Sequence, residues 1–295
     1  MPDGGCQNVE RAKVQHELRP VRPTRPAAAY IGGKRRLAAE LVRRIEAVPH
    51  TTYAEPFVGM GGVFLRRAAA PGCEVINDIS RDVATFFRIL QRHYPQFIET
   101  LRFQITSRWE FERLMATDPD TLTDLERAAR FLYLQRLAYG GKVSGRNFGT
   151  DRLGGGRFDV TRLGPLLEEI HLRVAGVVIE CLPWAEFLTR YDGPGTLFYL
   201  DPPYWGSEDD YGAGKFARRD YAALAAALAG IGGRFILSLN DVLETRELFS
   251  RFAIEPVSTR YTVAGGQWAE AKEIIVTGPR RDSVPPPRDL LSLTQ

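Results

Sequence analysis

Hydrophobic positions in the first third of the chain follow two different spacings. Leu37, Leu41 and Ile45 recur at helical intervals until Pro49, which predicts a helix that ends there. Short continuous apolar runs predict buried strands instead. The expected elements are a helix over 37–48, a strand over 51–54, a helix over 63–70, a strand over 74–77 and a helix over 80–93. This order of elements corresponds to one half of a doubly wound α/β sheet.

The pattern changes between residues 95 and 176, where strand-like runs are missing and helical spacing dominates. Strands and helices alternate again after residue 176. Helices are expected over 125–139, 161–171, 184–191, 221–228 and 242–252, and strands over 177–180, 196–200, 234–239, 255–263 and 273–276. The predicted fold class is α/β, with a doubly wound, mostly parallel seven-stranded sheet and a mainly helical insertion.

These changes of pattern also predict how the chain is divided. Residues 27–94 and 177–279 are expected to form one ligand-binding domain, interrupted by an inserted domain over 95–176. Residues 1–26 carry four prolines and no sustained period, so we expect a disordered arm. The proline-rich segment 280–295 is expected to be a flexible tail.

Composition narrows the class of protein. The 295 residues are 44% hydrophobic and 25% charged, without a run of eighteen apolar residues or a signal peptide, which predicts a soluble cytoplasmic protein. The three cysteines and four histidines lack the spacing of metal ligands, so no metal site is expected. The net charge is +3, but eight Arg and Lys residues between Arg127 and Arg162 face only Asp151 and Asp159. This surplus suits either a nucleic acid or a solvated basic surface, and charge alone favours neither.

A rigid turn follows the strand predicted over 196–200. Asp201, Pro202, Pro203 and Tyr204 come directly after it, and the prolines end regular strand pairing because they lack an N–H donor. The carboxyl end of a strand is where open α/β sheets bind ligands. A carboxylate, free carbonyl oxygens and a flat ring suit an amino group on a planar heterocycle. A β-turn with a solvated Asp201 is the alternative, and the apolar strand and Tyr204 favour the functional interpretation.

A second group of residues predicts a nucleoside site. Gly59 and Gly61 lie between a predicted strand and helix, where they allow close approach of a ligand to the helix N-terminus. Asp78 ends the next strand, 19 residues after Gly59, where a carboxylate accepts hydrogen bonds from ribose hydroxyls. The two glycines and Asp78 favour an adenosine-bearing ligand rather than a purely structural turn. They do not distinguish a dinucleotide from S-adenosylmethionine.

Two features favour S-adenosylmethionine. The dinucleotide fingerprint G-x-G-x-x-G is incomplete, because Phe64 stands in the place of its third glycine. Glu55 and Phe57 also put a carboxylate and a ring at the mouth of the site. A carboxylate repels a pyrophosphate but tolerates the sulfonium and ammonium groups of S-adenosylmethionine.

Taken together, these motifs resemble the DNA adenine methyltransferases of the Dam type. The resemblance covers about residues 28–278 and follows the order of motifs in that family, although Asp-Pro-Pro-Tyr alone also occurs in methyltransferases that act on other amines. It implies methyl transfer from S-adenosylmethionine to the exocyclic N6 amine of adenine in double-stranded DNA, with 95–176 as the target-recognition insertion. We expect a monomer. The matching segments are Tyr30–Lys34, Ala54–Gly62, Asn77–Asp78, Tyr199–Tyr204 and Ser238–Asp241.

The resemblance also implies residue roles. Tyr30 and Lys34 would contact the methionine part of the cofactor, and Asp78 would hold the ribose. Asp201 and the carbonyl of Pro202 would accept hydrogen bonds from the adenine amine, while Tyr204 stacks on the base. The implied cofactor-binding residues are Tyr30, Lys34, Glu55, Phe57, Gly59, Gly61, Asp78 and Asp201, and the implied catalytic residues are Asp201, Pro202 and Tyr204.

One departure from the family pattern affects the target base. The family usually places an acid beside an aromatic ring after the strand predicted over 177–180, and here Pro183 precedes Trp184. Trp184 is expected to contact the base, with Glu180 or Glu186 as substitutes for the missing acid. The Gly- and Arg-rich loop over 140–156 offers Arg146, Asn147 and Arg152 for DNA, with phosphate contact the expected role.

Several other functions remain open at this point. The same site could methylate the N4 amine of cytosine or a protein amide, and the basic insertion favours DNA over protein. A DNA-binding relative with a weakened active site is also compatible with Pro183, although intact Asp201 and Tyr204 argue against it. A dehydrogenase is the weakest alternative because of the incomplete glycine fingerprint.

Overall fold

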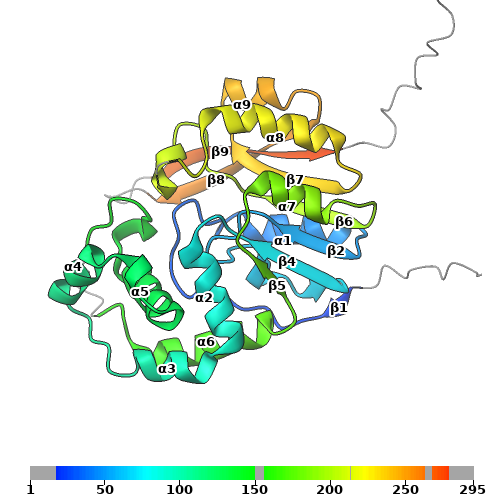
Figure 1. Ribbon diagram of the computed structural model, residues 1–295. Coiled ribbons are helices and arrows are strands. Elements are labelled where there is room, and N and C mark those ends of the chain that lie inside the picture. Colours follow the sequence, from blue (N-terminus) through cyan, green and yellow to red (C-terminus); the bar gives the residue numbers. More distant parts are fainter. Residues whose placement is uncertain (1–17, 150–155, 213, 263–267, 279–295) are drawn as a thin grey trace, which may run out of the picture.

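A seven-stranded sheet forms the centre of the protein (Figure 1). The computed structural model describes residues 18–149, 156–212, 214–262 and 268–278. Within them the strand order is β5-β4-β2-β6-β7-β9-β8. Five strands are parallel, and β9 runs antiparallel to both β7 and β8. The strands are β2 (Thr52–Glu55), β4 (Cys73–Asn77), β5 (Val178–Glu180), β6 (Thr196–Leu200), β7 (Arg234–Asn240), β8 (Ala253–Thr262) and β9 (Trp268–Gly278). The predicted α/β fold class is confirmed.

The direction of winding reverses between β2 and β6. From β2 the chain moves outward through β4 to β5, and it then returns to β6 on the other side of β2 before continuing to β7. The loops after these two central strands therefore leave in opposite directions. Such a switch point opens a crevice at the carboxyl ends of the strands.

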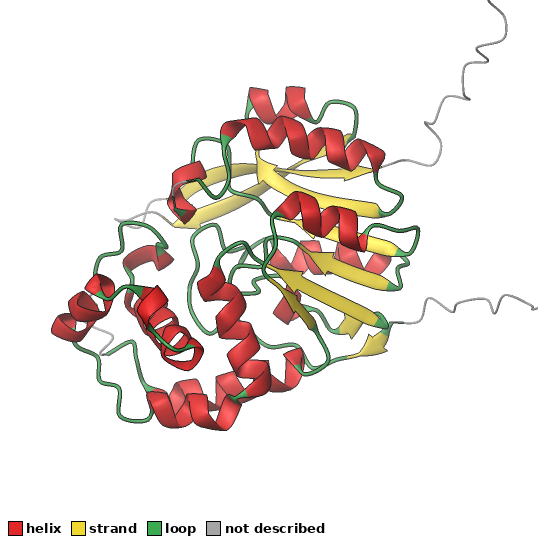
Figure 2. Cartoon of the chain, viewed as in Figure 1, coloured by secondary structure: helices red, strands yellow, loops and turns green. Residues whose placement is uncertain are grey.

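Alternate residues of β6 separate two hydrophobic cores. Leu197 and Tyr199 contribute to the core that contains the helices α1, α2, α5 (Asp124–Leu137) and α6 (Val160–Val174). Phe198 and Leu200 contribute to the core beneath α7 and α8. Figure 2 shows the helices on both sides of the yellow strands. Burial of both faces explains the continuous apolar run of this parallel strand. The helices against the sheet are α1 (Ala38–Ala47), α2 (Arg81–Arg92), α7 (Trp184–Tyr191), α8 (Arg218–Gly230) and α9 (Leu243–Leu248).

The segment predicted as an insertion is helical in its described residues. It packs against α2, where the ring of Phe86 lies edge-on to Phe97 and Phe131 at centroid distances of 6.2 and 5.9 Å. Thr123 and Glu126 form a reciprocal capping box that fixes the start of α5. The core is thus continuous with that of the sheet, which holds this segment against the crevice. Its helices are α3 (Tyr94–Leu101), α4 (Arg108–Ala116), α5 (Asp124–Leu137) and α6 (Val160–Val174).

Two local predictions are wrong. Residues 63–70 form a single 3₁₀ turn, η1 (Phe64–Arg66), rather than a helix, and β3 (Ala69–Ala70) then pairs with β1 (Arg19–Pro20). The guanidinium of Arg67, which hydrogen-bonds to the Ala69 carbonyl and pairs with buried Glu74, holds the chain out of a helix at this point.

The second error concerns the N-terminal arm, because residues 18–26 have defined partners. The N–H of Val21 donates to the Ala68 carbonyl at 2.9 Å, and the Thr24 hydroxyl donates to Glu169 at 2.8 Å. The remainder of the predicted arm and the tail over 280–295 lie outside the described residues. No helix in the described part of the chain is both long and apolar enough to cross a membrane.

Candidate active site

A cavity of about 630 Å³ opens at the switch point of the sheet. Three carboxylates line it, each from the carboxyl end of a different strand. Glu55 ends β2, Asp78 follows β4 and Asp201 follows β6. Parallel strands end at one edge of the sheet, so residues that are far apart in the sequence meet there. The three carboxylates that were assigned to the cofactor from the sequence therefore line one cavity.

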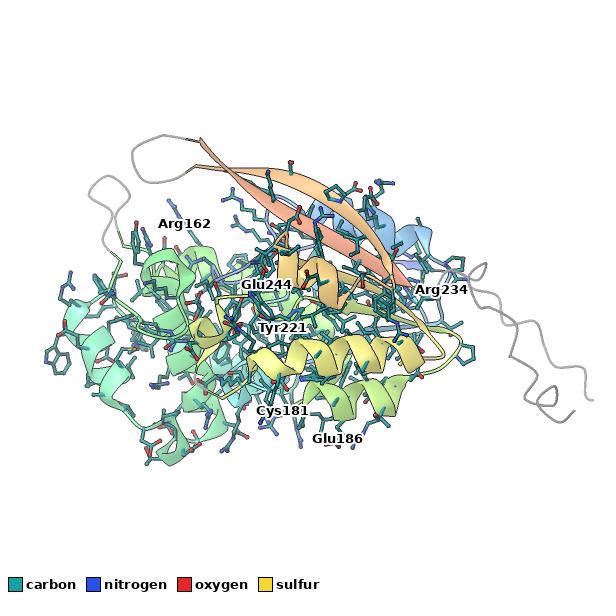
Figure 3. All side chains as sticks on the ribbon, turned by 90° about the horizontal axis from the view of Figure 1, so that it is seen from above. Arg162, Cys181, Glu186, Tyr221, Arg234 and Glu244 are labelled. Atoms are coloured by element: carbon teal, nitrogen blue, oxygen red, sulfur yellow. The ribbon has the colours of Figure 1, made fainter. Side chains whose placement is uncertain are left out.

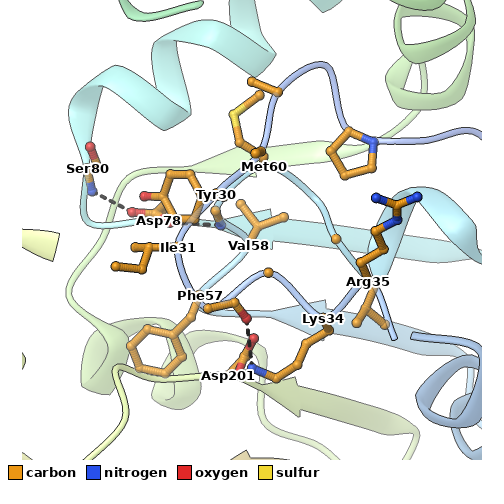
Figure 4. Close-up of a pocket in the computed structure, with 18 of the residues that line it drawn as sticks. Tyr30, Ile31, Lys34, Arg35, Phe57, Val58, Met60, Asp78, Ser80 and Asp201 are labelled. Carbon is orange, nitrogen blue, oxygen red and sulfur yellow. Dashed lines mark hydrogen bonds and ion pairs between the residues drawn. The ribbon is translucent and has the colours of Figure 1, made fainter. Parts of the chain in front are cut away.

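Asp78 is bound to the glycine turn opposite it. Its Oδ2 accepts the backbone N–H of Gly59 at 3.0 Å, and its Oδ1 accepts that of Ser80 at 2.8 Å (Figure 4). Burial raises the pKa of the Asp78 carboxyl, and these two hydrogen bonds lower it. Asp78 therefore both shapes the turn and lines the cavity.

Glycine is required at this turn because Tyr30 lies against it. Gly59 has φ of +51°, and a Cβ there would lie 2.9 Å from Cε1 of the Tyr30 ring. Gly61 has φ of +75°, and a Cβ there would lie 2.9 Å from Cγ of Leu65. Gly59 therefore puts bare backbone beside the Tyr30 ring in the wall of the cavity, where a ligand can approach closely. The side-chain position of Gly61 faces Leu65 and Phe87 in the core instead.

A loop from the opposite half of the sheet covers the same region. The Tyr211 hydroxyl donates to the Ile31 carbonyl at 3.0 Å, and its ring lies 5.9 Å from that of Tyr30. The N–H of Ser144, from the insertion, donates to the Asp210 carbonyl at 3.3 Å. Tyr211 thus belongs to the site. The sequence did not single it out, because its contact with Ile31 spans 180 residues of chain.

Asp201 makes an ion pair inside the cavity. Its Oδ1 lies 2.7 Å from Nζ of Lys34 and accepts a hydrogen bond from the Ser238 hydroxyl at 3.0 Å. No described residue donates to its other oxygen, Oδ2. Burial raises the pKa of Asp201, whereas the adjacent Lys34 ammonium lowers it. The sequence placed Lys34 at the cofactor, and Figure 4 shows its side chain directed at Asp201.

The rest of the Asp201–Tyr204 turn is held by its neighbours. The Tyr221 hydroxyl donates to the Pro203 carbonyl at 2.8 Å, and the Asn240 side chain forms two hydrogen bonds with the backbone of Trp205. Pro202 is buried. The Tyr204 hydroxyl donates to Glu273 of β9, and the ammonium of Lys34 lies 4.3 Å from the centre of the Tyr204 ring. The Tyr204 ring is therefore held through its hydroxyl by Glu273 and over its face by Lys34.

Glu55 is the third carboxylate of the cavity and is fully buried. It accepts a hydrogen bond from the Tyr53 hydroxyl at 2.6 Å. Burial raises its pKa to about 8, against the lowering effect of Tyr53 and Arg67. The ring of Phe57 lies beside it in the wall and packs edge-on against Phe216 at 5.8 Å.

Three residues predicted to contact DNA, Trp184, Arg146 and Asn147, do not line this cavity. Trp184 is half-buried at the start of α7, and Pro183 occupies the N-cap position of that helix without a side-chain hydrogen bond. The Arg146 guanidinium is hydrogen-bonded to the Gln135 side chain and the Lys142 carbonyl, while Asn147 is exposed. Arg152 lies outside the described residues. Among those residues, no cluster of His, Cys, Asp and Glu is placed to hold a metal ion.

Comparison with known proteins identifies the family. Residues 30–263 match the family described as D12 class N6 adenine-specific DNA methyltransferase. The chain belongs to this family, which confirms the resemblance and the predicted activity on the adenine N6 amine of DNA. The family implies a methyl donor and a DNA substrate.

Three relatives with low identity agree with this assignment. A DNA N-6-adenine-methyltransferase of Escherichia phage P1 is 26% identical over 71% of this chain, which spans 29% of that protein. The type II methyltransferase M1.LlaDCHI of Lactococcus lactis subsp. cremoris is 25% identical, with 86% of this chain and 95% of that protein covered. The retron Ec67 DNA adenine methylase of Escherichia coli is 26% identical, with 85% and 90% covered.

Proposed function

We propose that the chain uses S-adenosylmethionine as methyl donor and holds the target adenine of double-stranded DNA with Asp201, Pro202 and Tyr204. The observation that carries this proposal is the position of Asp201 and Asp78 in one cavity at the switch point. One carboxylate is thereby available to an amine and the other to a ribose.

The residues of the cavity fit the cofactor chemically. Bare backbone at Gly59 allows close approach, and the rings of Tyr30 and Phe57 offer apolar surfaces to an adenine. Asp78 can accept hydrogen bonds from ribose hydroxyls in addition to the backbone donors that it already holds. Buried Glu55 suits a cationic ligand, because a nearby positive charge favours its ionised form. S-adenosylmethionine supplies an electrophilic methyl group when bound.

The chemistry on the DNA side follows from the acceptors. The exocyclic nitrogen of adenine is a weak nucleophile, since its lone pair is delocalised into the ring. Oδ2 of Asp201 and the Pro202 carbonyl each accept a hydrogen bond from one N–H of the amine. These two hydrogen bonds favour a pyramidal nitrogen with a localised lone pair. Both acceptors also stabilise the positive charge that develops on this nitrogen during attack. Lys34 and Ser238 hold Oδ1 and so fix the carboxylate in the required orientation.

No strong base is required, because the alkylated nitrogen becomes acidic and loses its proton afterwards. The adenine must leave the base stack to reach a cavity of this kind. Tyr204 then stacks on the base, and its hydrogen bond to Glu273 keeps the ring from rotating away.

Substitution of Asp201 tests this proposal. Asp201→Ala should lower methyl transfer by at least about a hundredfold, because one preorganised group aimed at developing charge is lost. Asp201→Asn keeps one acceptor without the negative charge, so its residual activity separates hydrogen-bond geometry from charge. Tritium transfer from labelled S-adenosylmethionine to duplex DNA, followed by nucleoside analysis, gives both rate and product.

Two outcomes would contradict the proposal. Full activity of Asp201→Ala would remove this residue from the mechanism, and methylcytosine as the product would refute the adenine assignment. Cofactor binding by calorimetry and thermal unfolding of both variants are the controls. Cofactor binding should stay close to that of the unmodified chain in both variants. The unfolding temperature should fall more in Asp201→Ala than in Asp201→Asn, because alanine leaves the buried ammonium of Lys34 without its partner.

A further inference from the structure

The same cavity carries a concentration of positive charge that methyl transfer does not use. Five arginine side chains contribute to its lining. The three carboxylates of the lining are engaged elsewhere: Asp201 with Lys34, Glu55 with Tyr53 and Asp78 with the backbone. We call these five arginines, Arg25, Arg35, Arg66, Arg136 and Arg162, the arginine rim.

The arginines of the rim differ from others in this protein by their partners. Within the rim, only Arg162 forms an ion pair with a described carboxylate, that of Asp159 at 3.4 Å, and its own side chain is 88% exposed. Arg66 and Arg136 instead donate to backbone carbonyl oxygens, Arg66 to that of Gly62 and Arg136 to those of Ala27 and Arg157. By contrast, Arg127 pairs with Asp82 at 2.6 Å, and Arg173 makes two hydrogen bonds with Glu74. Pairing is therefore common for arginines in this fold, and the rim departs from it.

Members of the rim lie close enough to repel one another. Burial and the positive charge of Arg35 lower the pKa of Arg66. Burial and the charges of Arg25 and Arg157 lower the pKa of Arg136, against the raising effect of Asp159. The Nε of Arg136 is also buried without a hydrogen-bond partner among the described atoms. Like charges that are only partly compensated oppose folding, and a polyanion bound across them would offset that repulsion.

The rim comes from both sides of the crevice. Arg25 and Arg35 flank the Tyr30–Lys34 segment, and Arg66 belongs to η1 beside α1. Arg136 lies on α5 and Arg162 on α6, both from the helical segment (Figure 3 labels Arg162). Figure 4 shows Arg35 directed away from Lys34 and Asp201. Any molecule that contacts the whole rim must span the junction of the two parts.

We infer that the arginine rim binds backbone phosphates of the DNA on either side of the adenine that enters the cavity. This inference rests on the proposed function, because it places the DNA by the position of the reacting base. Guanidinium groups match phosphate oxygens through paired N–H donors. Most protein–DNA hydrogen bonds go to the backbone and fix the position of the protein on the duplex. The carboxylate of the cofactor needs one such partner, and five positive charges exceed that need.

Salt dependence of DNA binding distinguishes phosphate contacts from other roles. The test variant is Arg35→Gln/Arg162→Gln, which removes one exposed arginine from each side of the crevice. The control is Arg92→Gln/Arg251→Gln, which removes the same charge from exposed positions. Arg92 ends α2 and Arg251 precedes β8, and neither residue lines the cavity.

The probe is a fluorescein-labelled 20-base-pair duplex of arbitrary sequence in the presence of S-adenosylhomocysteine, with anisotropy measured at several salt concentrations. Each phosphate contact contributes about 0.9 to the slope of log affinity against log salt. The test variant should therefore lose up to about 1.8 of slope, and the control should match the unmodified chain. S-adenosylhomocysteine affinity should stay within about twofold in both.

The outcomes separate this inference from the function on which it rests. An unchanged slope in the test variant, with salt-dependent binding by the unmodified chain, would refute the phosphate role alone. Loss of S-adenosylhomocysteine affinity with unchanged DNA binding would assign the rim to the cofactor carboxylate and also refute it. Absence of salt-dependent duplex binding by the unmodified chain would refute the double-stranded DNA substrate together with the rim.

Discussion

Lys34 and Asp201 form an ion pair inside the cavity, with 2.7 Å between Nζ and Oδ1. The ammonium also donates to the Gly32 carbonyl at 3.0 Å and lies over the ring of Tyr204. The Gly-Gly-Lys turn therefore delivers a positive charge to the turn after β6. Because burial disfavours the ionised form of Asp201, this ion pair keeps the carboxylate available as a charged acceptor.

Removal of the Lys34 charge should change the pH dependence of methyl transfer. In Lys34→Met the pKa of Asp201 rises further, because the lowering effect of the ammonium is lost and burial remains. The acidic limb of the rate–pH profile should then move to higher pH, and Lys34→Arg should restore part of the original profile. Single-turnover rates across pH measure this limb. A uniform loss of rate at every pH would assign Lys34 to cofactor contact instead, as the sequence-based prediction has it.

Much of the site could be predicted because its residues end strands. Glu55, Asp78 and Asp201 each follow an apolar run, and such positions meet at one sheet edge whatever lies between them. The partners could not be predicted in the same way. Ser238, Glu273 and Tyr211 reach their contacts across 37, 69 and 180 residues, and no local pattern encodes such pairings.

The count of charged residues along the chain did not identify which arginines line the cavity. The surplus between Arg127 and Arg162 predicted DNA contacts by Arg146, yet its guanidinium is hydrogen-bonded within the insertion. Arg127 is likewise paired with Asp82, from a different helix. Arg25, Arg35 and Arg66 join the cavity from outside that stretch. The position of each side chain in the fold, which a linear count omits, therefore decides which charges face the cavity.

Asp78 should contribute to cofactor affinity. Asp78→Ala removes a charged acceptor, which should weaken S-adenosylmethionine binding by about 1.5–3 kcal/mol, equivalent to roughly 10- to 150-fold. Part of this loss should come from the Gly59 turn, whose N–H loses its partner. Calorimetry on the folded variant measures the affinity. Glu244→Ala, at an exposed position of α9, is the control. Unchanged affinity in Asp78→Ala would exclude it from the binding site.

Gly32 and Gly145 form a matched pair for testing the loop that carries Tyr211. Both have positive φ, +69° and +58°, so alanine at either position should cost about 1–2 kcal/mol of folding free energy. A Cβ at Gly32 would lie 2.3 Å from the Tyr211 hydroxyl, whereas a Cβ at Gly145 would meet no atom of the described residues within 4 Å. Gly32→Ala should therefore also displace Tyr211 and lower cofactor affinity by tenfold or more, about 1.4 kcal/mol. Equal effects of both variants on calorimetric affinity would show that Tyr211 does not close the site.

Glu55 should release a proton when a cationic cofactor binds. Its pKa of about 8 leaves it roughly nine-tenths protonated at pH 7, because the buried carboxylate is disfavoured. A sulfonium charge nearby lowers that pKa, so binding of S-adenosylmethionine should release up to about 0.9 proton per site. S-adenosylhomocysteine lacks the sulfonium charge and should release much less. Calorimetry at pH 7 in buffers of different ionisation enthalpy measures the difference.

Glu55→Gln supplies the control for this release, because the amide cannot titrate. Proton release on S-adenosylmethionine binding should disappear in this variant, while the hydrogen bond from Tyr53 can be kept by the amide oxygen. The pH dependence of folding should change in parallel. A carboxyl whose pKa is raised in the folded state stabilises that state fully below its unfolded pKa, and this contribution is lost as the pH rises through about 8. Glu55→Gln should therefore lose less stability than the unmodified chain between pH 5 and about 8, measured by denaturant unfolding. Identical pH profiles, or proton release that persists in Glu55→Gln, would place the titrating group elsewhere in the cavity.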